Sequence, residues 1–364
     1  MVYNVIGLMS GSSLDGLDIC FAQIEETRGN WTAQILNADC YTYEEQWIQK
    51  LRQATQLPVA EFLKLHTEYG RYTGELVNRF IAANELQHKV HFVASHGHTI
   101  LHEPAAQTSF QLGDGASIAA SISLPVINDL RALDVALGGQ GAPIVPIGDK
   151  LLFGAYDLLL NIGGIANISL RKEDTQYIGF DICVANQALN FLAQKTGKAY
   201  DESGSIAASG QVIEEELVKL ASNEFLEKAA PKSLSNEGAM AMVKTFVENE
   251  EYSLADRMNT MVHFIAEQIC QSIVQNLATE SIAHRKLLAT GGGAFNTYLM
   301  QVLSDKLATL DIALTIPDPQ TVAFKEALVM ALIGTLRWRE ESNTIASQTG
   351  ASKDSVGGAF WIGA

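Results

Sequence analysis

Cysteine is scarce in this sequence. The chain of 364 residues contains 4 cysteines, at positions 20, 40, 183 and 270, and no two of them form a C-x-x-C pair. This spacing excludes the usual zinc and disulfide frameworks and is typical of a protein from a reducing compartment.

The sequence also lacks signals for export and membrane insertion. Its start, Met1 to Val5, has neither a basic segment nor a long apolar run, so no signal peptide is expected. The most apolar later segments are interrupted by polar or charged side chains at 157–161 and 325–326, which excludes a transmembrane span. We therefore expect a cytoplasmic protein without a membrane partner.

Positive charge is in the minority. The chain has 25 Lys and Arg against 41 Asp and Glu, which gives a net charge of −16. An acidic surface repels a phosphate backbone, so we expect no nucleic-acid partner. A small nucleotide responds to its local pocket and is not excluded by this charge.

The common nucleotide-binding signatures are missing as well. The sequence has no G-x-x-x-x-G-K-[ST] loop, no G-x-G-x-x-G after a strand and no H-R-D catalytic loop. A nucleotide would therefore have to bind through another motif.

The chain does contain enough apolar material for two domains. Hydrophobic residues make up 47% of it, and its length exceeds the roughly 250–300 residues at which a single core stops growing. We expect domain I to span residues 1–134 and about 340–364, and domain II to span 135–339. The glycine-rich stretch 137–143 is expected at a crossing between them or in a cleft.

Apolar runs of strand length alternate with helical patterns, which predicts an α/β protein. Strands are expected at 3–9, 18–24, 90–95, 124–128, 157–162, 166–170, 286–289 and 312–316, and helices at 59–87, 254–278 and 324–339. The regions 3–24 and 157–170 each resemble a β-hairpin around a small-residue turn. They are either two unrelated hairpins or the start of a duplicated domain.

Three glycine-rich turns follow predicted strands and are candidates for binding ATP. Their candidate ligands are Gly11, Ser12, Ser13, Asp15 and Gly16 in the first turn, Gly163 and Gly164 in the second, and Gly291, Gly292, Gly293 and Asn296 in the third. Backbone N–H groups in such turns form anion-binding concavities. Asp15 and Asp18 are candidate carboxylates for the water shell of Mg²⁺.

Polar side chains gather between residues 95 and 134. His96 and His98 end a predicted strand, and Asp129 and Arg131 follow another. Strand ends are where α/β folds build their sites. The alternatives are structural histidines and an ordinary Asp129–Arg131 ion pair.

Asp181 directly precedes the helical pattern 184–194. This position fits an N-cap aspartate and equally a general base at the end of a strand.

Together these residues resemble the anhydro-N-acetylmuramic acid kinase family. Gly7–Gly16 is similar to the family's G-x-M-S-G-T-S-L-D-G, and A-L-G-G-Q-G-A-P at 136–143 also matches. Ser95–His102 is similar to the H-G-Q-T stretch, with His98 in place of the glutamine. Further matches extend over essentially the whole chain.

The resemblance implies a two-domain actin-like ATPase (ribonuclease H-like) fold, with ATP in an inter-domain cleft, and it suggests a homodimer. It also implies a reaction of cell-wall recycling. The 1,6-anhydro bond of anhydro-N-acetylmuramic acid is hydrolysed and the freed O6 is phosphorylated, giving N-acetylmuramic acid 6-phosphate and ADP.

The resemblance further implies site residues. Asp181 occupies the place of the catalytic base, and Arg131 and Glu326 fall where sugar contacts lie. We expect His96 and Asp129 to bind the sugar as well. The cofactors would be ATP and Mg²⁺, with Asp15 contacting the metal through water.

The sequence departs from the family in two loops. The usual D-T-G-P-G-N is Asp181-Ile182-Cys183-Val184-Ala185-Asn186 here, and the usual T-G-R-E after Ser233 is replaced by residues 234–238. Two glycines, a proline and an arginine are lost. Two rival functions therefore stay open: a related kinase for another amino sugar, and a catalytically weak actin-like ATPase that acts as a nucleotide-driven binding module.

Overall fold

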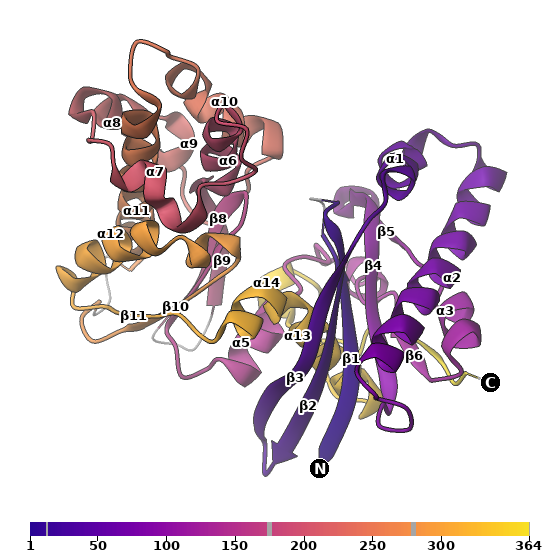
Figure 1. Cartoon of the computed structure of the whole chain (residues 1–364). Coiled ribbons are helices and arrows are strands. Elements are labelled where there is room, and N and C mark those ends of the chain that lie inside the picture. Colours follow the sequence, from indigo (N-terminus) through magenta and orange to yellow (C-terminus); the bar gives the residue numbers. More distant parts are fainter. Residues whose placement is uncertain (12–13, 173–176, 278–281, 364) are drawn as a thin grey trace. The chain divides into compact units, whose positions relative to one another are not determined.

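The computed structural model describes residues 1–11, 14–172, 177–277 and 282–363 (Figure 1). The chain forms two compact units: unit 1, Met1–Gly154 with Phe324–Ala364, and unit 2, Ala155–Ala323. The first crossing between the units lies later in the chain than the 134/135 boundary that the sequence indicates. The second lies earlier than the expected 339/340 boundary.

The glycine-rich stretch 137–143 is not one of these crossings. Inside unit 1, the N–H of Gly141 donates to the Asp134 carboxylate (2.8 Å). The N–H of Gln140 donates to the carbonyl of Thr349 (2.7 Å). These bonds hold the stretch within unit 1.

Unit 1 is built on a seven-stranded sheet. Its strands are β1 (Val2–Ser10), β2 (Gly16–Thr27), β3 (Asn30–Thr42), β4 (Phe92–Glu103), β5 (Thr108–Leu112), β6 (Val126–Asn128) and β12 (Ala359–Trp361). The order is β12-β6-β4-β1-β2-β3, with β5 paired to β4. The first three strands are antiparallel, whereas β4 runs parallel to β1 and β6 runs parallel to β4.

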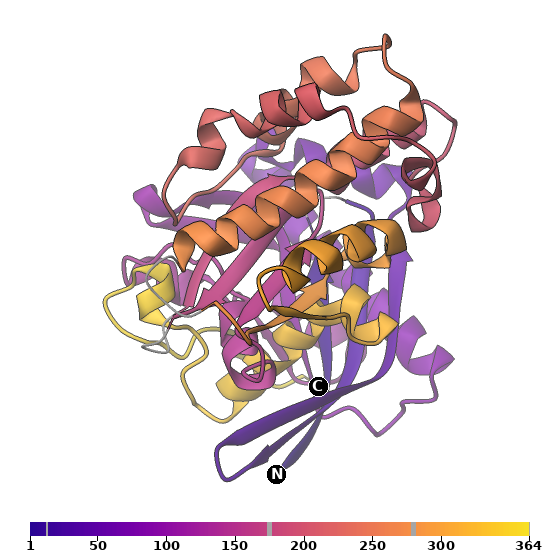
Figure 2. The ribbon, with the colours of Figure 1, turned by 90° about the vertical axis from the view of Figure 1, so that its left-hand side faces the viewer.

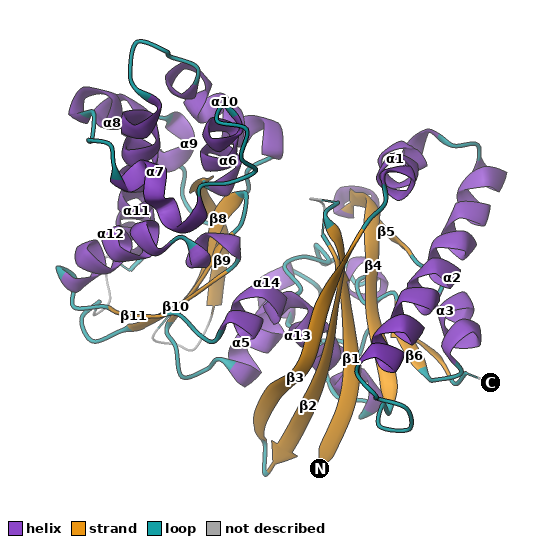
Figure 3. Ribbon diagram, in the orientation of Figure 1, coloured by secondary structure: helices purple, strands orange, loops and turns teal. Residues whose placement is uncertain are grey.

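Helices cover both faces of this sheet (Figure 3). They are α1 (Glu45–Gln53), α2 (Val59–Ala83), α3 (Gly115–Ile122), α4 (Ala132–Ala136), α5 (Pro146–Leu152), α13 (Pro319–Trp338) and α14 (Ala346–Thr349), with 3-10 turns η1 (Ala54–Gln56) and η2 (Pro104–Ala106). Successive strand residues point to opposite faces. Accordingly, Ile6 packs into the core with α2 and α3, and its neighbour Val5 packs into the core with α5 and α13.

Unit 2 repeats the same arrangement. Its strands are β7 (Leu158–Ile162), β8 (Ile165–Arg171), β9 (Tyr177–Val184), β10 (Lys286–Thr290) and β11 (Ala313–Thr315), in the order β11-β10-β7-β8-β9. Again the first three are antiparallel, and β10 and β11 continue the sheet in parallel. The sheet order therefore favours the duplicated domain over two unrelated hairpins.

One extensive core fills unit 2. Its helices are α6 (Asn186–Gln194), α7 (Ser205–Ala208), α8 (Glu214–Ala221), α9 (Glu224–Glu227), α10 (Asn236–Val247), α11 (Leu254–Asn276) and α12 (Thr297–Ala308), with 3-10 turns η3 (Glu202–Gly204) and η4 (Gly292–Phe295). Figure 2 shows α11 lying along this sheet, which it contacts at β8 and β9. A side-chain cap begins α11, because Ser253 Oγ accepts from the N–H of Asp256 (3.1 Å).

Each strand that the sequence predicts is found, and β4 continues to Glu103, well beyond its predicted end at residue 95. The strands β3, β5, β9 and β12 were not predicted. In β3, the alternation of polar and apolar residues from Asn30 to Ile35 was the available signal. None of the helices in the described part of the chain is long and apolar enough to cross a membrane.

Gly7 allows α13 to pack directly on β1. A Cβ at this position would lie 1.9 Å from the carbonyl oxygen of Ala327 and 2.8 Å from the backbone nitrogen of Ala331. The helix backbone thus occupies the place of a side chain.

We expect Gly7→Ala to lower the free energy of unfolding by about 1–3 kcal/mol, the usual cost of overpacking a core. Urea unfolding measures this change. Gly292→Ala is the matched control, because its added Cβ would meet only the Asn186 side chain at an ordinary 3.6 Å. Equal stability of Gly7→Ala and the wild type would contradict the packing described here.

Candidate active site

The first glycine turn joins β1 to β2. The pairing of Met9 with Asp18 sets its base, and the N–H of Leu14 donates to the carbonyl of Gly11 (3.4 Å). Gly16 is needed for close packing, since a Cβ there would lie 2.7 Å from the Tyr41 carbonyl oxygen. The candidate ligands Ser12 and Ser13 lie outside the described residues.

Carboxylates gather beside this turn. The pKa of Asp18 is raised to about 6, chiefly by burial and in smaller part by the negative charges of Asp15 and Glu326, against a hydrogen bond with Cys40 that lowers it. Burial also raises the pKa of Glu326, which the positive charges of Lys325 and Arg131 oppose. The structure thus brings Asp15, Asp18 and Glu326 into one electrostatic neighbourhood.

Arg131 and His96 are in direct contact. Arg131 Nε donates to His96 Nε2 (2.8 Å), so the ring proton of His96 lies on Nδ1 and is donated to the carbonyl of Gly97 (2.9 Å). The Arg131 guanidinium also donates to the carbonyl of Gly141. Burial lowers the pKa of Arg131 to about 10, and Glu326 and Asp134 act in the opposite direction.

Asp129 does not belong to this group. The residue is exposed and its φ is 55°. Partial burial of the carboxyl group raises its pKa, and the charge of His66 opposes this rise. The expected alternative, an Asp129–Arg131 ion pair, is therefore not formed, since the Arg131 side chain donates to His96 and Gly141 instead.

The second and third glycine turns lie side by side in unit 2. They follow the parallel strands β7 and β10, where Asn161 pairs with Thr290. Gly291 has a φ of 82°, and a Cβ on Gly293 would lie 2.2 Å from the Ile162 side chain. The third turn is therefore packed against the end of β7.

Within the third turn, Gly292 is the open position and Asn296 is a helix cap. An added Cβ at Gly292 would have only the Asn186 side chain within 4 Å. Asn296 Oδ1 accepts from the N–H of Leu299 (3.0 Å), which caps the start of α12.

The second turn caps α6. The carbonyl of Gly163 accepts from the N–H of Asn186 (3.1 Å), and the carbonyl of Gly164 accepts from those of Ala185 (2.8 Å) and Gln187 (3.2 Å). The N-cap residue of α6 is thus Ala185, without a side-chain cap. The N-cap interpretation of Asp181 is therefore wrong.

Asp181 instead lies inside β9 and contacts a neighbouring loop. Its Oδ2 accepts from the N–H of Leu234 (2.8 Å) and from Ser233 Oγ (3.2 Å). The N–H of Asp181 donates to the carbonyl of Lys232 (3.0 Å). Burial raises the pKa of Asp181, and the two hydrogen bonds to its carboxylate oppose that rise.

The two sequence departures have a simple structural outcome. Cys183 and Val184, which replace the family's first glycine and its proline, continue β9. Ala185, which replaces the second glycine, is the N-cap residue of α6. In the second loop, Asp181 is bound by a backbone N–H at position 234, which any residue except proline supplies.

A row of polar side chains that the sequence analysis did not identify leads across this sheet. Asn161 in β7 lies opposite Asn167 in β8, and Asn167 lies opposite Asp181 in β9. Directly opposed residues share one face of a sheet. In the sequence, this row could have been found from the asparagine in each of two apolar strands. A buried side-chain amide without a hydrogen-bond partner is costly, so an asparagine in such a strand indicates a polar partner.

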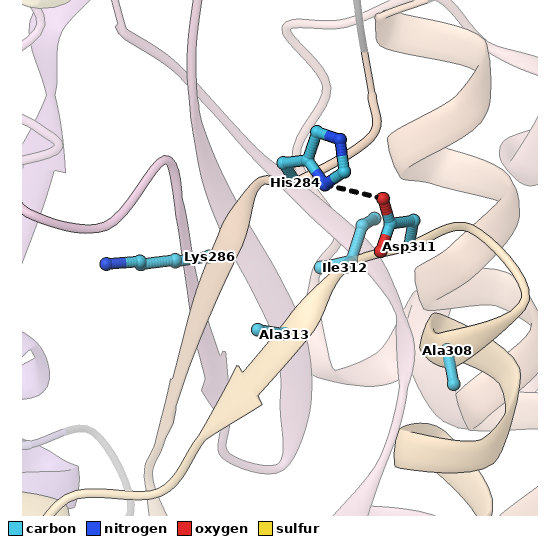
Figure 4. A pocket seen from close by; sticks show the side chains of 6 residues that line it. All are labelled: His284, Lys286, Ala308, Asp311, Ile312 and Ala313. Carbon is cyan, nitrogen blue, oxygen red and sulfur yellow. Dashed lines mark ion pairs between the residues drawn. The ribbon is translucent and has the colours of Figure 1, made fainter.

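A separate open pocket of about 410 Å³ lies at the other end of β10 (Figure 4). There His284 pairs with Asp311 (2.7 Å), and both side chains are exposed. The Lys286 side chain extends away from this pair. The pocket adjoins the start of β10, whereas the third glycine turn follows its end.

The sheet order found in both units, with a glycine turn after the first strand of each, defines a two-domain actin-like ATPase fold. Residues 3–363 match the sequence model for "Anhydro-N-acetylmuramic acid kinase". The chain belongs to this kinase family.

Curated relatives with that same name are similar over nearly their full length. The protein from Aliivibrio fischeri is 32% identical over 361 residues, which cover 96% of each chain. The one from Francisella tularensis subsp. novicida is 31% identical, with 95% of each chain covered. The one from Sulfurimonas denitrificans is 30% identical, with 98% of each chain covered.

Among solved structures, the activator of the 2-hydroxyisocaproyl-CoA dehydratase from Clostridium difficile with bound ADPNP is similar over 94% of this chain and 99% of that chain. The sequence identity is 15% and the TM-score is 0.42. The fold assignment given above rests on the strand order.

Two buried neutral histidines should make the protein sensitive to acid. Burial lowers the pKa of His96 to about 3 and that of His98 to about 4, from 6.5. Between about pH 4 and pH 6.5 the two histidines are protonated in the unfolded chain and neutral in the folded chain. Stability is therefore retained above about pH 6.5 and is lost as the pH falls.

The wild type should lose unfolding free energy as the pH falls from about 7 to about 5. We expect this loss to be about 2 kcal/mol smaller in His98→Gln. Urea unfolding at the two pH values gives this difference. An equal loss in the variant and the wild type would show that His98 does not titrate differently on unfolding.

Proposed function

We propose that this protein is an ATP-dependent kinase that opens the 1,6-anhydro ring of anhydro-N-acetylmuramic acid and phosphorylates O6. The products are N-acetylmuramic acid 6-phosphate and ADP, and the reaction serves cytoplasmic recycling of peptidoglycan. The observation that carries the proposal is the placement of Asp181. This partly buried carboxylate lies in the unit that holds two adjacent glycine turns, in a chain of this kinase family.

Asp181 acts as the general base. A base must be unprotonated and fixed in position. The hydrogen bonds from Leu234 and Ser233 to Oδ2 hold the carboxylate in place and favour its unprotonated form. Asp181 takes a proton from water as the water oxygen adds to C1 of the sugar. The C1–O6 bond breaks, and O6 then accepts the phosphoryl group of ATP.

The glycine turns bind the nucleotide. Their backbone N–H groups are suited to phosphate oxygens, and the open face of Gly292 leaves room for a ligand. Asn296 takes part as the cap that fixes the turn to α12.

Asp15 and Asp18 fit a magnesium ion bound through water. The negative charge of Asp15 contributes to the raised pKa of Asp18, and a divalent cation would offset the charge of this pair. Mg²⁺ prefers oxygen ligands and keeps several waters. When bound with ATP, the metal neutralises charge on the phosphates.

Arg131 and Glu326 bind the sugar, and His96, whose two ring nitrogens are both hydrogen-bonded within the protein, positions Arg131. They form one polar group, in which Arg131 contacts His96 and interacts electrostatically with Glu326. The sugar-binding role of Asp129 and the homodimer stay predictions from the sequence.

We expect Asp181→Asn to lower kcat by about 10²–10⁴-fold, the usual contribution of a general base, with ATP affinity nearly unchanged. Asparagine retains an oxygen that can accept from Leu234, so the loop contact is preserved. Steady-state kinetics with a panel of anhydro and reducing amino sugars, with products identified by mass, measures the effect and the sugar together.

Ser233→Ala is the matched control, because it removes one hydrogen bond to Asp181 but keeps the base. Its kcat should fall far less than that of Asp181→Asn. A folded Asp181→Asn protein with near-wild-type turnover would exclude the proposed base. A wild type that binds ATP but phosphorylates no sugar in the panel would favour the binding-module alternative.

We expect Gly292→Leu to weaken ATP binding at least tenfold while the protein stays folded, because the open side of this glycine is filled. Gly292→Ala should have a smaller effect. Isothermal calorimetry with ATP gives both affinities, and circular dichroism confirms folding. Unchanged affinity in folded Gly292→Leu would remove the third turn from the nucleotide site.

A further inference from the structure

A buried chain of hydrogen bonds lies behind the first glycine turn. Tyr69 OH and Tyr43 OH are 2.5 Å apart, Tyr43 OH donates to Ser10 Oγ (2.7 Å), and Ser10 Oγ is 3.0 Å from His98 Nδ1. The exposed fraction of all four residues is 5% or less. None of the roles assigned above uses this chain.

The chain has one direction when the ring proton of neutral His98 lies on Nε2, which leaves Nδ1 as an acceptor. Tyr43 donates to Ser10, so the Ser10 hydroxyl is left to donate its own proton to His98 Nδ1. Tyr69 then donates to Tyr43. A buried hydroxyl without an acceptor is costly, so His98 fixes the orientation of the Ser10 hydroxyl.

The same chain holds both ends of the first turn. Ser10 is the last residue of β1, directly before Gly11, and it pairs in register with His98 of β4. At the other end, the N–H of Tyr43 donates to the carbonyl of Asp15 (3.3 Å). Tyr43 therefore contacts the residue before the turn through its hydroxyl and the end of the turn through its amide.

We propose that the Tyr69–Tyr43–Ser10–His98 chain positions Gly11 and Asp15, the described ends of the first glycine turn, for ATP, and that His98 and Tyr43 are its positioning residues. The proposal rests on the proposed function only in that the first turn binds ATP. It does not depend on which sugar is phosphorylated. In this protein a histidine fills the place of the family's glutamine, and either side chain can accept a hydrogen bond from the Ser10 hydroxyl.

The test compares two histidine variants. His98→Leu removes the acceptor, and we expect it to weaken ATP affinity and raise the KM for ATP about tenfold, with the KM for the sugar within about twofold of wild type. His98→Gln restores an acceptor and should keep the KM for ATP within about twofold. A general structural defect would move both KM values and would not be rescued by glutamine.

The second comparison uses tyrosines and keeps the proposal testable if His98→Leu does not fold. Tyr43→Phe should also weaken ATP binding about tenfold. Tyr72→Phe is the matched control, because this ring lies next to Tyr43, with centroids 6.3 Å apart, but its hydroxyl is not a member of the chain. We expect wild-type ATP affinity for Tyr72→Phe.

ATP affinity is measured by calorimetry without sugar, so a wrong sugar assignment leaves this result intact. Wild-type ATP affinity in folded His98→Leu or Tyr43→Phe would overturn the positioning role. Equal weakening by His98→Gln and His98→Leu would also overturn it. A wild type that binds no ATP would overturn the proposed function, and the positioning role with it.

Discussion

The parallel pairing of β7 with β10 is the interaction on which the candidate site of unit 2 depends. It aligns Asn161 with Thr290, so the turns that follow the two strands lie against each other. Loss of this register would separate Gly163 and Gly164 from Gly291. Unit 1 uses the same device, since the parallel pairing of β1 with β4 places Ser10 beside His98. In each unit a parallel neighbour thus supports the turn that follows the first strand.

Electrostatics divides unit 1 into two kinds of polar group. His96 and His98 are buried and neutral, and their hydrogen bonds hold Arg131 and Ser10. Burial raises the pKa of Asp18, and the negative charges of Asp15 and Glu326 act in the same direction. The first group is satisfied within the protein, whereas a bound cation would offset the charge of the second. This difference is why we propose a positioning role for His98 and metal binding for Asp15 and Asp18.

The sequence was sufficient for the strands of both hairpins, because apolar runs of strand length are bounded there by small-residue turns. It could not separate the two interpretations of Asp181, since an N-cap and a base both precede a helix. Only the structure shows that Ala185 begins α6 and that Asp181 contacts residues 233 and 234. Such contacts between distant segments leave no periodic signal in the sequence. The same holds for Tyr43, whose partners Ser10 and Tyr69 lie far from it in the chain.

The central claim is that water opens the anhydro ring and that the freed O6 receives the phosphoryl group. Mass spectrometry of a short reaction in water enriched in heavy oxygen tests this most directly. The account predicts one heavy oxygen on C1 of the sugar phosphate and none in its phosphate group. A sugar phosphate without the label on C1, or label found only in free phosphate from ATP hydrolysis, would contradict it.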